Sequence, residues 1–349
     1  MRHARRGAGG RRGMTGPGLL AGDVLVVVPC LNERANLPRL LDRLIADTGG
    51  ADIVVADGGS IDGSQEIVAD YRRRFRNIHL LANLRRVQSA GINLAVTAMG
   101  RDKRWLLRID AHCDYPPGYM AGLLDSAVRH GAASVVVPMI TRGHGCFQRA
   151  CAEAQNSLIG TGGSPHRHVG AGRYVDHGHH ALMRIDLFLR VGGYRETQSH
   201  NEDAELDIRL RAAGGRIWLE PRQAIVYHPR KTAGALLRQY FKYGEGRART
   251  MRLHGSRLKP RQAAPLLVPF AVALLPFALL HPIFALPAAA WAAICLLYGL
   301  LLGVRARSAC IAASGVAAMI MHLGWGSGYL RQFLQPRPRD RYLPALTLR

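Results

Sequence analysis

A long run without charge near the C-terminal end is the feature that most constrains how this chain folds. Residues 263–304 hold no Asp, Glu, Lys or Arg, and prolines divide them into a first apolar stretch, 265–280, and a second, 283–304. Two arginines follow, and a third apolar stretch covers 308–330. A helix needs about 20 apolar residues to cross a bilayer. The second and third stretches are long enough, whereas the first is short and proline-rich, which favours a kinked span or a re-entrant hairpin.

We interpret residues 265–330 as a transmembrane region of two to three spans, because 42 uncharged residues in a row are too many for the alternative, the buried helices of a soluble domain. Arginine-rich segments lie before the first stretch and between the second and third. The positive-inside rule places both on the cytoplasmic side. This predicts a multi-pass protein of the inner membrane with a cytoplasmic N-terminal domain. The topology of the third stretch stays open, because a third crossing would carry the basic tail, 331–349, outside, against the positive-inside rule.

The net charge of +23 is carried almost wholly by arginine, which indicates an anionic partner such as nucleic acid, a lipid headgroup surface or a phosphorylated substrate. The basic linker 246–264 suits membrane lipids with anionic headgroups. The six cysteines form no CxxC pair, which argues against a disulfide framework and a cysteine-rich zinc module and fits a reducing compartment. Residues 1–22 are basic and glycine-rich without an apolar core, so we expect a disordered leader rather than a secretory signal.

Residues 23–245 alternate short apolar runs with amphipathic stretches. Strand and helix in turn predict an α/β domain with a mostly parallel sheet covered on both faces. In such sheets ligands bind beyond the carboxyl ends of the strands, so we expect Asp57 and Asp110 on the same edge. The runs that we expect to be strands are 24–29, 51–57, 77–82, 104–110 and 132–138.

The sequence RIDAHCD, residues 108–114, concentrates potential metal ligands at one strand end. On an extended chain alternate side chains point to opposite faces, so Asp110, His112 and Asp114 share a face. Cys113 points to the other face and packs as a small apolar group. Such close neighbours on one extended segment do not close around a tetrahedral zinc ion. Carboxylates at a strand end suit Mg²⁺ or Mn²⁺, held by one or two protein ligands and by substrate phosphates.

Two further strand ends and an arginine loop could hold a nucleotide diphosphate. PCLNE (29–33) ends the first strand, and ADGGSIDGS (56–64) ends the second with Asp57, whose carboxylate could accept hydrogen bonds from a base or ribose. Arg86 and its neighbour could bind the diphosphate. The alternatives stay open, because a turn with Ser60 capping the next helix explains the glycine-rich string nearly as well, and loop arginines are often simply solvated.

Together with NEDAELDIRLRAAGG (201–215), these motifs in this order resemble the inverting family 2 glycosyltransferases, which have the GT-A nucleotide-binding fold. RIDAHC, YFKYGEGRA and MHLGWGSGYL are similar to the succinoglycan-biosynthesis glucosyltransferase-like branch of bacterial membrane enzymes. The resemblance covers residues 23–245. It implies a Rossmann-like mostly parallel sheet, a UDP-linked hexose donor and a divalent cation, Mg²⁺ or Mn²⁺.

The resemblance also implies roles for individual residues. Asp110 and His112 occupy the family's metal motif, usually written DxD, and the histidine in second place leaves the number of direct metal ligands undecided. His228 could complete the metal shell, although a lone histidine at a strand end is as often structural. The nucleotide-sugar pocket would be lined by Pro29, Leu31, Glu33, Asp57, Arg86 and Asp110.

The same resemblance makes Asp203 the catalytic base. Inverting transfer needs a carboxylate that takes a proton from the acceptor hydroxyl, and a cation can neutralise the leaving diphosphate. Asp203 opens a predicted helix, whose dipole favours the ionised form; the alternative is that Glu202 and Asp203 are only first-turn helix acids. The residues expected on the acceptor side are Glu202, Gln239, Lys242 and Tyr243.

Two features near the acceptor side are less settled. Many relatives carry QxxRW where this chain has RQYFKY (238–243), so processivity is undecided. The histidine-rich stretch 160–180 is interpreted as an acceptor-side loop, with a solvated loop or a second metal site as alternatives.

The interpretation as a whole is a membrane-anchored, inverting hexosyltransferase that acts on a lipid-linked saccharide in exopolysaccharide or cell-surface polysaccharide synthesis. A rival within the same fold transfers the sugar to polyisoprenyl phosphate, an acceptor that hardly needs a base. A rival of another class is a membrane-anchored nucleic-acid-binding protein. The carboxylates at the sheet edge, the lack of an interleaved basic and aromatic patch and the apolar C-terminal stretches argue against nucleic acid as a partner.

Overall fold

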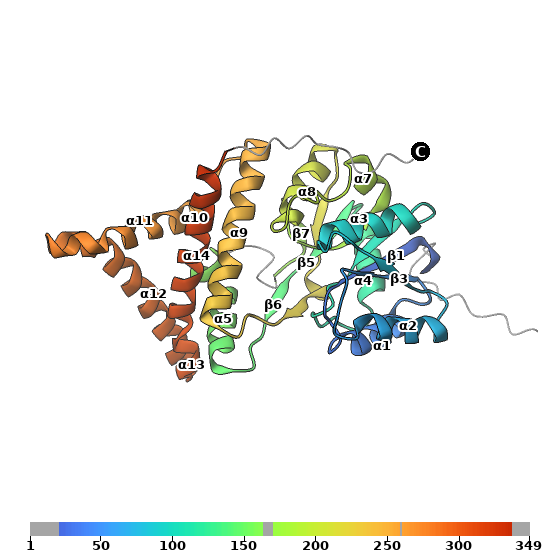
Figure 1. Cartoon of the computed structure of the whole chain (residues 1–349), viewed down its shortest axis with the longest axis horizontal. Helices are drawn as coiled ribbons and strands as arrows, with labels where there is room; N and C mark the ends of the chain where they lie inside the picture. Colours follow the sequence, from blue (N-terminus) through green and yellow to red (C-terminus); the bar gives the residue numbers. More distant parts are fainter. Residues whose placement is uncertain (1–20, 163–169, 259, 337–349) are drawn as a thin grey trace, which may run out of the picture.

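The apolar run that follows Asp23 forms the central strand of an α/β sheet, β1 (Val24–Cys30), in the computed structural model (Figure 1). β1 pairs in parallel with β2 (Asp52–Asp57) on one side and with β4 (Trp105–Arg108) on the other. Its side chains alternate between two hydrophobic clusters, one on each face of the sheet, as expected for a strand buried on both faces. The structure describes residues 21–162, 170–258 and 260–336, so most of the predicted leader and tail lies outside the described residues.

The remaining strands extend this sheet. The order across it is β3-β2-β1-β4-β8-β5-β9-β7, and β8 is antiparallel to both of its neighbours. A separate pair, β6 and β10, lies beyond it. The strands not yet given are β3 (Ile78–Ala82), β5 (Ser134–Val137), β6 (Met139–Thr141), β7 (Arg173–Tyr174), β8 (His179–Arg184), β9 (Ile217–Leu219) and β10 (Ile225–Tyr227). The predicted mostly parallel α/β sheet is therefore confirmed, and the five predicted strands are present.

Helices cover both faces of the sheet, and together they form what we call the α/β body. One hydrophobic cluster joins β1 to α1 (Leu37–Asp47), α2 (Ser64–Arg74) and α4 (Tyr119–Arg129). The other joins it to α3 (Gln88–Met99), α7 (Ile185–Arg190) and α8 (Glu202–Ala212). Two short 3₁₀ helices complete the body, η1 (Ala21–Asp23) and η3 (Pro221–Gln223). Two further helices, α5 (Cys146–Asn156) and α6 (Leu158–Thr161), pack against α14 rather than against the sheet.

Two long helices, α9 (Ala233–His254) and α14 (Ser314–Leu334), pack side by side between the α/β body and the apolar region (Figure 1). Glycines allow their backbones to touch: a Cβ added at Gly244 would overlap the carbonyl of Trp325, and one at Gly328 would overlap the carbonyl of Phe241. α9 continues without a break through residue 245, where the sequence suggested a domain end.

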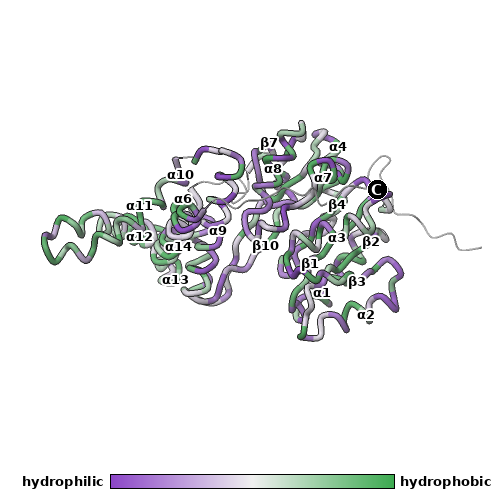
Figure 2. The backbone as a smooth tube through the Cα atoms, turned by 45° about the horizontal axis from the view of Figure 1, so that its top comes forward, coloured by the Kyte–Doolittle hydropathy of each residue, from purple (hydrophilic) through white to green (hydrophobic). Residues whose placement is uncertain are grey.

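The apolar residues between these helices form a hairpin that projects away from the rest of the molecule (Figures 1 and 2). We call residues 264–305 the apolar hairpin. Two segments of the described residues are long and apolar enough to cross a membrane, Pro282–Arg305 in this hairpin and Ala309–Leu334, which contains α14. The elements of this region are α10 (Pro260–Ala263), η4 (Ala264–Leu266), α11 (Leu267–Ala273), η5 (Leu275–Leu279), η6 (Pro282–Ala285), α12 (Leu286–Arg305) and α13 (Ala309–Ala312).

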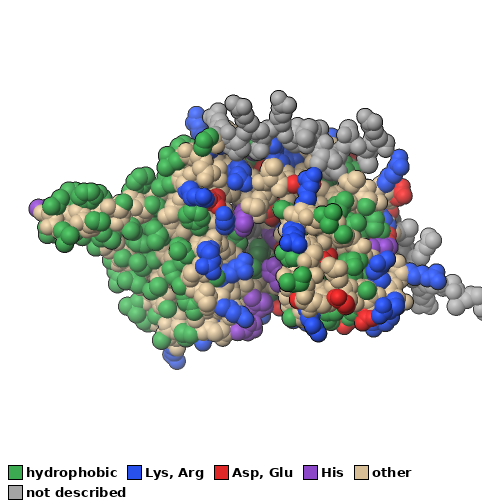
Figure 3. Space-filling model, viewed as in Figure 1, with side chains coloured by type: hydrophobic (Ala, Val, Ile, Leu, Met, Phe, Trp, Pro, Cys, Tyr) green, Lys and Arg blue, Asp and Glu red, His purple; other side chains and the backbone are tan. Residues whose placement is uncertain are grey.

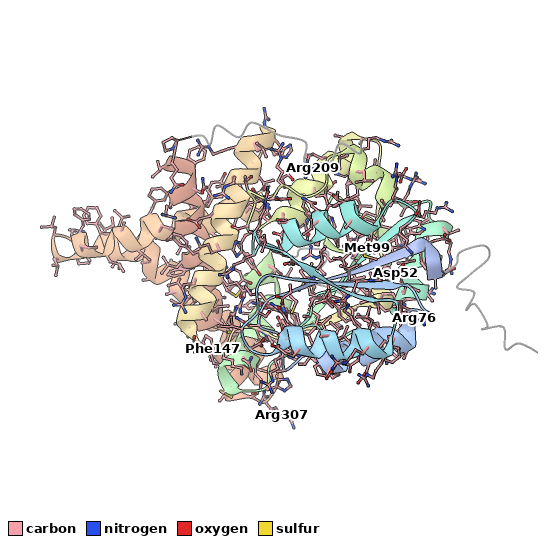
Figure 4. All side chains as sticks on the ribbon, turned by 45° about the vertical axis from the view of Figure 1, so that its right-hand side comes forward. Asp52, Arg76, Met99, Phe147, Arg209 and Arg307 are labelled. Atoms are coloured by element: carbon pink, nitrogen blue, oxygen red, sulfur yellow. A yellow bond between two sulfur atoms is a disulfide. The ribbon has the colours of Figure 1, made fainter. Side chains whose placement is uncertain are left out.

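A disulfide joins Cys146, at the start of α5, to Cys310 in α13, a bond that the sequence argument against a disulfide framework did not anticipate. The two residues are 164 positions apart, and no spacing pattern reveals such a pair. They meet because α13 and α14 pack against α5. Figure 4 shows Phe147 of α5 and Arg307, which precedes α13, at the same end of the molecule.

The contact between α9 and α14 predicts opposite effects for one substitution at two glycines. Gly328→Ala should lower the melting temperature of the detergent-solubilised protein, because the new methyl group overlaps the backbone of Phe241, a strain of about 1–3 kcal/mol. Gly234→Ala, in the exposed first turn of α9, meets only the end of the Arg238 side chain at 3.5 Å and should raise stability by up to ~1 kcal/mol through helix propensity. Equal effects at both positions would show that the helices do not touch here.

Candidate active site

A cavity of about 740 Å³ begins at the carboxyl edge of the sheet and reaches the helices of the apolar region. Its walls at the sheet edge include Arg108, Asp110 and Asp203, and its far end includes Trp291 of α12 and Trp325 of α14. Figure 3 shows histidine side chains gathered where the surface is hollowed between the α/β body and the helices. One space therefore connects charged groups at the sheet edge with the apolar hairpin.

Arg108, the last residue of β4, is 4% exposed and lies among three carboxylates. It forms an ion pair with Asp203, its Nε lies 3.3 Å from Asp110 Oδ1, and its Nη2 lies 3.9 Å from Glu202 Oε1. The guanidinium also donates a hydrogen bond to the hydroxyl of Tyr194 at 3.2 Å. A buried cation of this kind is stable only when several partners compensate its loss of hydration. Arg108 therefore holds the sheet edge and the first turn of α8 together.

Asp203 lies in the first turn of α8, where the helix dipole favours a negative charge. The Tyr194 hydroxyl donates to its Oδ1 at 3.1 Å, and His180 Nδ1 lies 3.5 Å from the same atom. Burial raises the pKa of Asp203, but the charges of Arg108 and His180 outweigh this and hold it well below its usual range. Asp203 is therefore a carboxylate at neutral pH.

The pKa of the neighbouring carboxyl, Glu202, is shifted in the opposite direction. Burial and the negative charge of Asp203 raise its pKa to about 7. Two adjacent acids in one helix turn thus differ in protonation, because Arg108 pairs closely with Asp203 and lies farther from Glu202. Both acids line the cavity.

His179, at the start of β8, lies between the two groups that the sequence analysis singled out. Its Nε2 is 3.5 Å from Asp110 Oδ2, and its Nδ1 is 3.8 Å from Asp203 Oδ2. The next residue, His180, is fully buried and contacts Asp207 Oδ1 at 2.6 Å and the Tyr194 hydroxyl at 2.7 Å. Asp110 and Asp203, far apart in sequence, are brought to one wall of the cavity by this histidine pair and Arg108.

Four residues at the centre of this site were not predicted: Arg108, His179, His180 and Tyr194. The sequence did contain a signal for Arg108. A charged residue that ends a buried apolar strand needs a partner of opposite charge, which predicts an ion pair at this position. His179 and His180 were assigned to the 160–180 loop, but they open a strand; His166 and His168 of that stretch lie outside the described residues.

The sequence predicted Asp110 and His112 as donors for a divalent cation. Asp110 accepts hydrogen bonds from Gln88 Nε2 at 2.9 Å and from Arg108, and both Asp110 and His112 line the cavity. His112 Nδ1 lies 3.2 Å from Glu33 Oε1. One carboxylate and one imidazole suit a cation that takes most of its other ligands from phosphates. In the part of the chain that the structure describes, no group of three or more His, Cys, Asp or Glu converges as a metal site.

His228 lies apart from this pair. Its Nε2 is 3.3 Å from Asp114 Oδ2, its Nδ1 is 3.0 Å from the carbonyl of Arg142, and its ring stacks on His144. It does not line the cavity. The structure therefore brings together two of the three predicted metal ligands.

The predicted nucleotide residues converge on the ends of β1 and β2. Asp57 is buried and its carboxylate caps the following turn, accepting from the backbone amides of Gly59 and Ser60 at 2.9 Å. A Cβ at Gly58 would contact the Leu31 side chain and the backbone of Arg86, and one at Gly59 would contact the Arg86 guanidinium, so both exposed residues lie against the glycine turn that follows Asp57. Ser60 does not cap the next helix, the alternative that the sequence left open, because α2 begins at Ser64 with Gly63 at its N-cap position.

Of the residues predicted on the acceptor side, Lys242 lies away from the cavity that the others line. Gln239 and Tyr243 line the cavity, and the Gln239 amide donates to the hydroxyls of Tyr227 at 2.8 Å and Tyr243 at 2.9 Å. Lys242 does not line it. Its ammonium pairs with Glu245 at 2.8 Å, and Glu245 also pairs with Arg331 of α14. Lys242 thus belongs to the contact between α9 and α14.

Comparison with known proteins agrees with the fold and the order of the motifs. A family model described as glycosyl transferase family 2 matches residues 25–192. The succinoglycan biosynthesis protein ExoA of Rhizobium meliloti (strain 1021) is 44% identical over 318 residues, which cover 90% of this chain and 96% of that protein. The chain belongs to glycosyltransferase family 2.

Among solved structures, the mannosyltransferase PcManGT from Pyrobaculum calidifontis, in complex with GDP-Man and Mn²⁺, is similar to this chain with a TM-score of 0.56. It is 19% identical, and the similarity covers 86% of this chain and 87% of that one. Similarity at this level shows the shared fold. The family 2 membership and the GT-A fold expected from the motifs are both confirmed.

The raised pKa of Glu202 predicts a pH-dependent stability. Because its pKa of about 7 lies above the ordinary 4.5, the folded protein binds this proton more tightly than the unfolded chain does. The resulting stabilisation is present below the ordinary pKa and is lost as the pH rises through about 7, on the order of 2 kcal/mol between pH 5 and 8. Glu202→Gln should flatten this part of a thermal-unfolding profile, whereas Glu66→Gln on an exposed position of α2 should not. Parallel profiles for the wild type and Glu202→Gln would contradict the assignment.

Proposed function

We propose that this family 2 enzyme is an inverting, metal-dependent hexosyltransferase that uses a nucleotide-diphosphate sugar, UDP-linked, and a lipid-linked saccharide acceptor. The single observation that carries the proposal is the cavity that joins the carboxylates at the sheet edge to the root of the apolar hairpin. A water-soluble donor and a lipid-linked acceptor need such a space, because one reacting group comes from solution and the other from a membrane. The role in exopolysaccharide synthesis follows from the similarity to ExoA.

The donor end of the cavity is the edge at Asp110. Asp110 and His112 would hold Mg²⁺ or Mn²⁺, as the Mn²⁺ bound with GDP-Man in PcManGT supports. When bound, the cation would neutralise the charge on the leaving diphosphate. The nucleotide would lie over the ends of β1 and β2, near Leu31, Asp57 and Arg86.

Asp203 is the proposed base. As the acceptor oxygen bonds to C1 of the sugar and the bond from C1 to the diphosphate breaks, the hydroxyl proton passes to the Asp203 carboxylate. Arg108 and Tyr194 orient that carboxylate and keep it ionised. His179 lies within 4 Å of both Asp110 and Asp203, so it would contact the transferred sugar or the attacking hydroxyl.

The acceptor would approach from the opposite end. Gln239 and Tyr243 line the part of the cavity that the acceptor would pass. Trp291 and Trp325 line the part beside the apolar hairpin. Aromatic rings at that position suit the saccharide and the first apolar units of a lipid. The arginine distribution places the α/β body on the cytoplasmic side of the inner membrane.

Nucleotide release tests the donor and the cation. The membrane fraction with its lipid extract would be offered UDP-glucose, UDP-galactose and GDP-mannose in turn, with Mn²⁺, Mg²⁺ or a chelator. We expect release from one UDP-sugar, lost with the chelator and in Asp110→Asn, and retained in Asp70→Asn, an exposed carboxyl of α2. Absence of both release and metal-dependent nucleotide binding would exclude the transferase assignment for these donors.

Replacement of the proposed base distinguishes a saccharide hydroxyl from a polyisoprenyl phosphate as the acceptor. Asp203→Asn should lower turnover by about 10²–10⁴-fold, the usual size of general-base catalysis, and should leave UDP affinity in isothermal titration near that of the wild type. If turnover falls less than about tenfold, the acceptor is an anion that needs no base, and polyisoprenyl phosphate replaces the saccharide in the proposal.

A further inference from the structure

The third apolar stretch, which is long enough to cross a bilayer, packs against a charged helix over most of its length. α14 and α9 run in parallel: Gly324 lies against Leu237, Gly328 against Phe241, and the Gln332 amide oxygen accepts from Arg249 at 3.3 Å. At the end of the pair, Arg252 donates to the carbonyl of Gln335 at 2.7 Å. α14 therefore cannot enter a bilayer without carrying α9 into it.

α9 is unsuited to the interior of a bilayer. It carries charged side chains along most of its length, and the cost of one charge at the centre of a membrane is about 2.5–3.5 kcal/mol even on the most favourable scale. Those that lie between its second and last turns are Arg238, Lys242, Glu245, Arg247, Arg249 and Arg252.

α9 is also fastened to the α/β body. Gln198 Nε2 donates to the carbonyl of Gly246 at 3.0 Å, and His254 Nε2 lies 2.9 Å from Glu205 Oε1 at the start of α8. A Cβ at Gly246 would overlap the carbonyl of His200. α14, α9 and α8 are thus successive layers of one packed unit, and a crossing by α14 would draw polar layers into the hydrocarbon.

The apolar hairpin contacts α14 at its base, where a Cβ at Gly326 would overlap the carbonyl of Pro265 and one at Gly299 would overlap the backbone of Gly315. Unlike α9, it carries no Asp, Glu, Lys or Arg before Arg305. Both of its arms expose large apolar side chains on many sides (Figures 2 and 3). Its first arm, from Ala264 to Leu280, measures roughly 25 Å at 1.5 Å per residue, close to the ~30 Å of a hydrocarbon core. The chain turns back at His281. The most exposed of these side chains are Leu267, Leu279, Leu280, Leu286, Ile294, Leu297 and Val304.

Directly after the hairpin the chain packs against α5, a helix that also contacts β6 and α14. The disulfide between Cys146 and Cys310 joins α5 to α13, and Arg149 Nη2 donates to Ser308 Oγ at 3.1 Å. Arg305 and Arg307 are exposed at this point, where they can meet anionic headgroups at about 1 kcal/mol each. Both ends of the hairpin therefore lie on the same side of any membrane that it enters.

We propose that a lipid bilayer holds this enzyme from one side only: the apolar hairpin enters it and returns, and α14 lies at its surface as part of the packed unit with α9. The proposal rests on the membrane association in the proposed function and adds its topology. It also places Pro265, Val268 and Trp291, which line the cavity, at the level of the lipid headgroups. A lipid-linked acceptor then reaches the site sideways, with its chain still in the bilayer.

Labelling of single added cysteines in the full-length protein tests the topology. Ser256→Cys precedes the hairpin and Gln335→Cys follows α14, and both positions are exposed. With a membrane-impermeant maleimide we expect both variants to react in inverted membrane vesicles, at least tenfold more than in right-side-out vesicles. The wild type gives the background, because its free cysteines at 30, 113, 151 and 295 are buried. Reaction of the two variants on opposite faces would overturn the proposal.

A charge in the hairpin tests which segment does the anchoring. Leu297→Arg, at a position 65% exposed, should move most of the protein from the membrane pellet to the supernatant after a carbonate-free salt wash. Val128→Arg, at a position 52% exposed on α4, is the matched control and should stay in the pellet. Retention of Leu297→Arg would overturn the hairpin as the anchor. A wild type found only in the supernatant would instead remove the membrane part of the proposed function, on which this inference rests.

Discussion

The site depends on a single buried cation at the end of a central strand. Arg108 compensates the charges of Asp203 and Asp110 and reaches Glu202, and without it three carboxyl groups would repel one another in a poorly hydrated space. Its unequal distances to Asp203 and Glu202 also explain why adjacent acids have opposite pKa shifts. The geometry of the sheet edge and the protonation of the α8 turn thus have one cause.

A second constraint joins this edge to the apolar region. Because glycines in α9 and α14 allow backbone contact, the two helices form one wall of the cavity, and the apolar hairpin starts beside it. A bulky residue at those positions would separate the helices and open the cavity to solvent. The same contact therefore shapes the end of the cavity at the proposed acceptor side and joins α14 to a charged helix.

Local patterns account for much of what could be predicted. The five predicted strands follow from apolar runs of four to seven residues. Asp110, His112 and Asp203 were predicted as site residues because each belongs to a short motif, and the structure shows that all three line the cavity. β8 was missed, since only Ala181, Leu182 and Met183 separate its histidines from Arg184 and a pattern this short does not distinguish a strand from a loop. The partners of Arg108 on α8, Glu202 and Asp203, lie some 95 residues further along the chain, and no local pattern connects them to it.

The sequence by itself determined that a mostly parallel α/β sheet is followed by segments too apolar for water, because strand burial and hydropathy depend on the residues of each segment. Only the tertiary structure decided which of those segments packs along a charged helix. α14 is nearly as apolar as a membrane span, but its neighbour α9, some 80 residues earlier in the chain, carries the charges that keep it out of the hydrocarbon. Hydropathy is a property of one helix, whereas the free energy of entering a bilayer also includes the transfer of every helix that is packed against it.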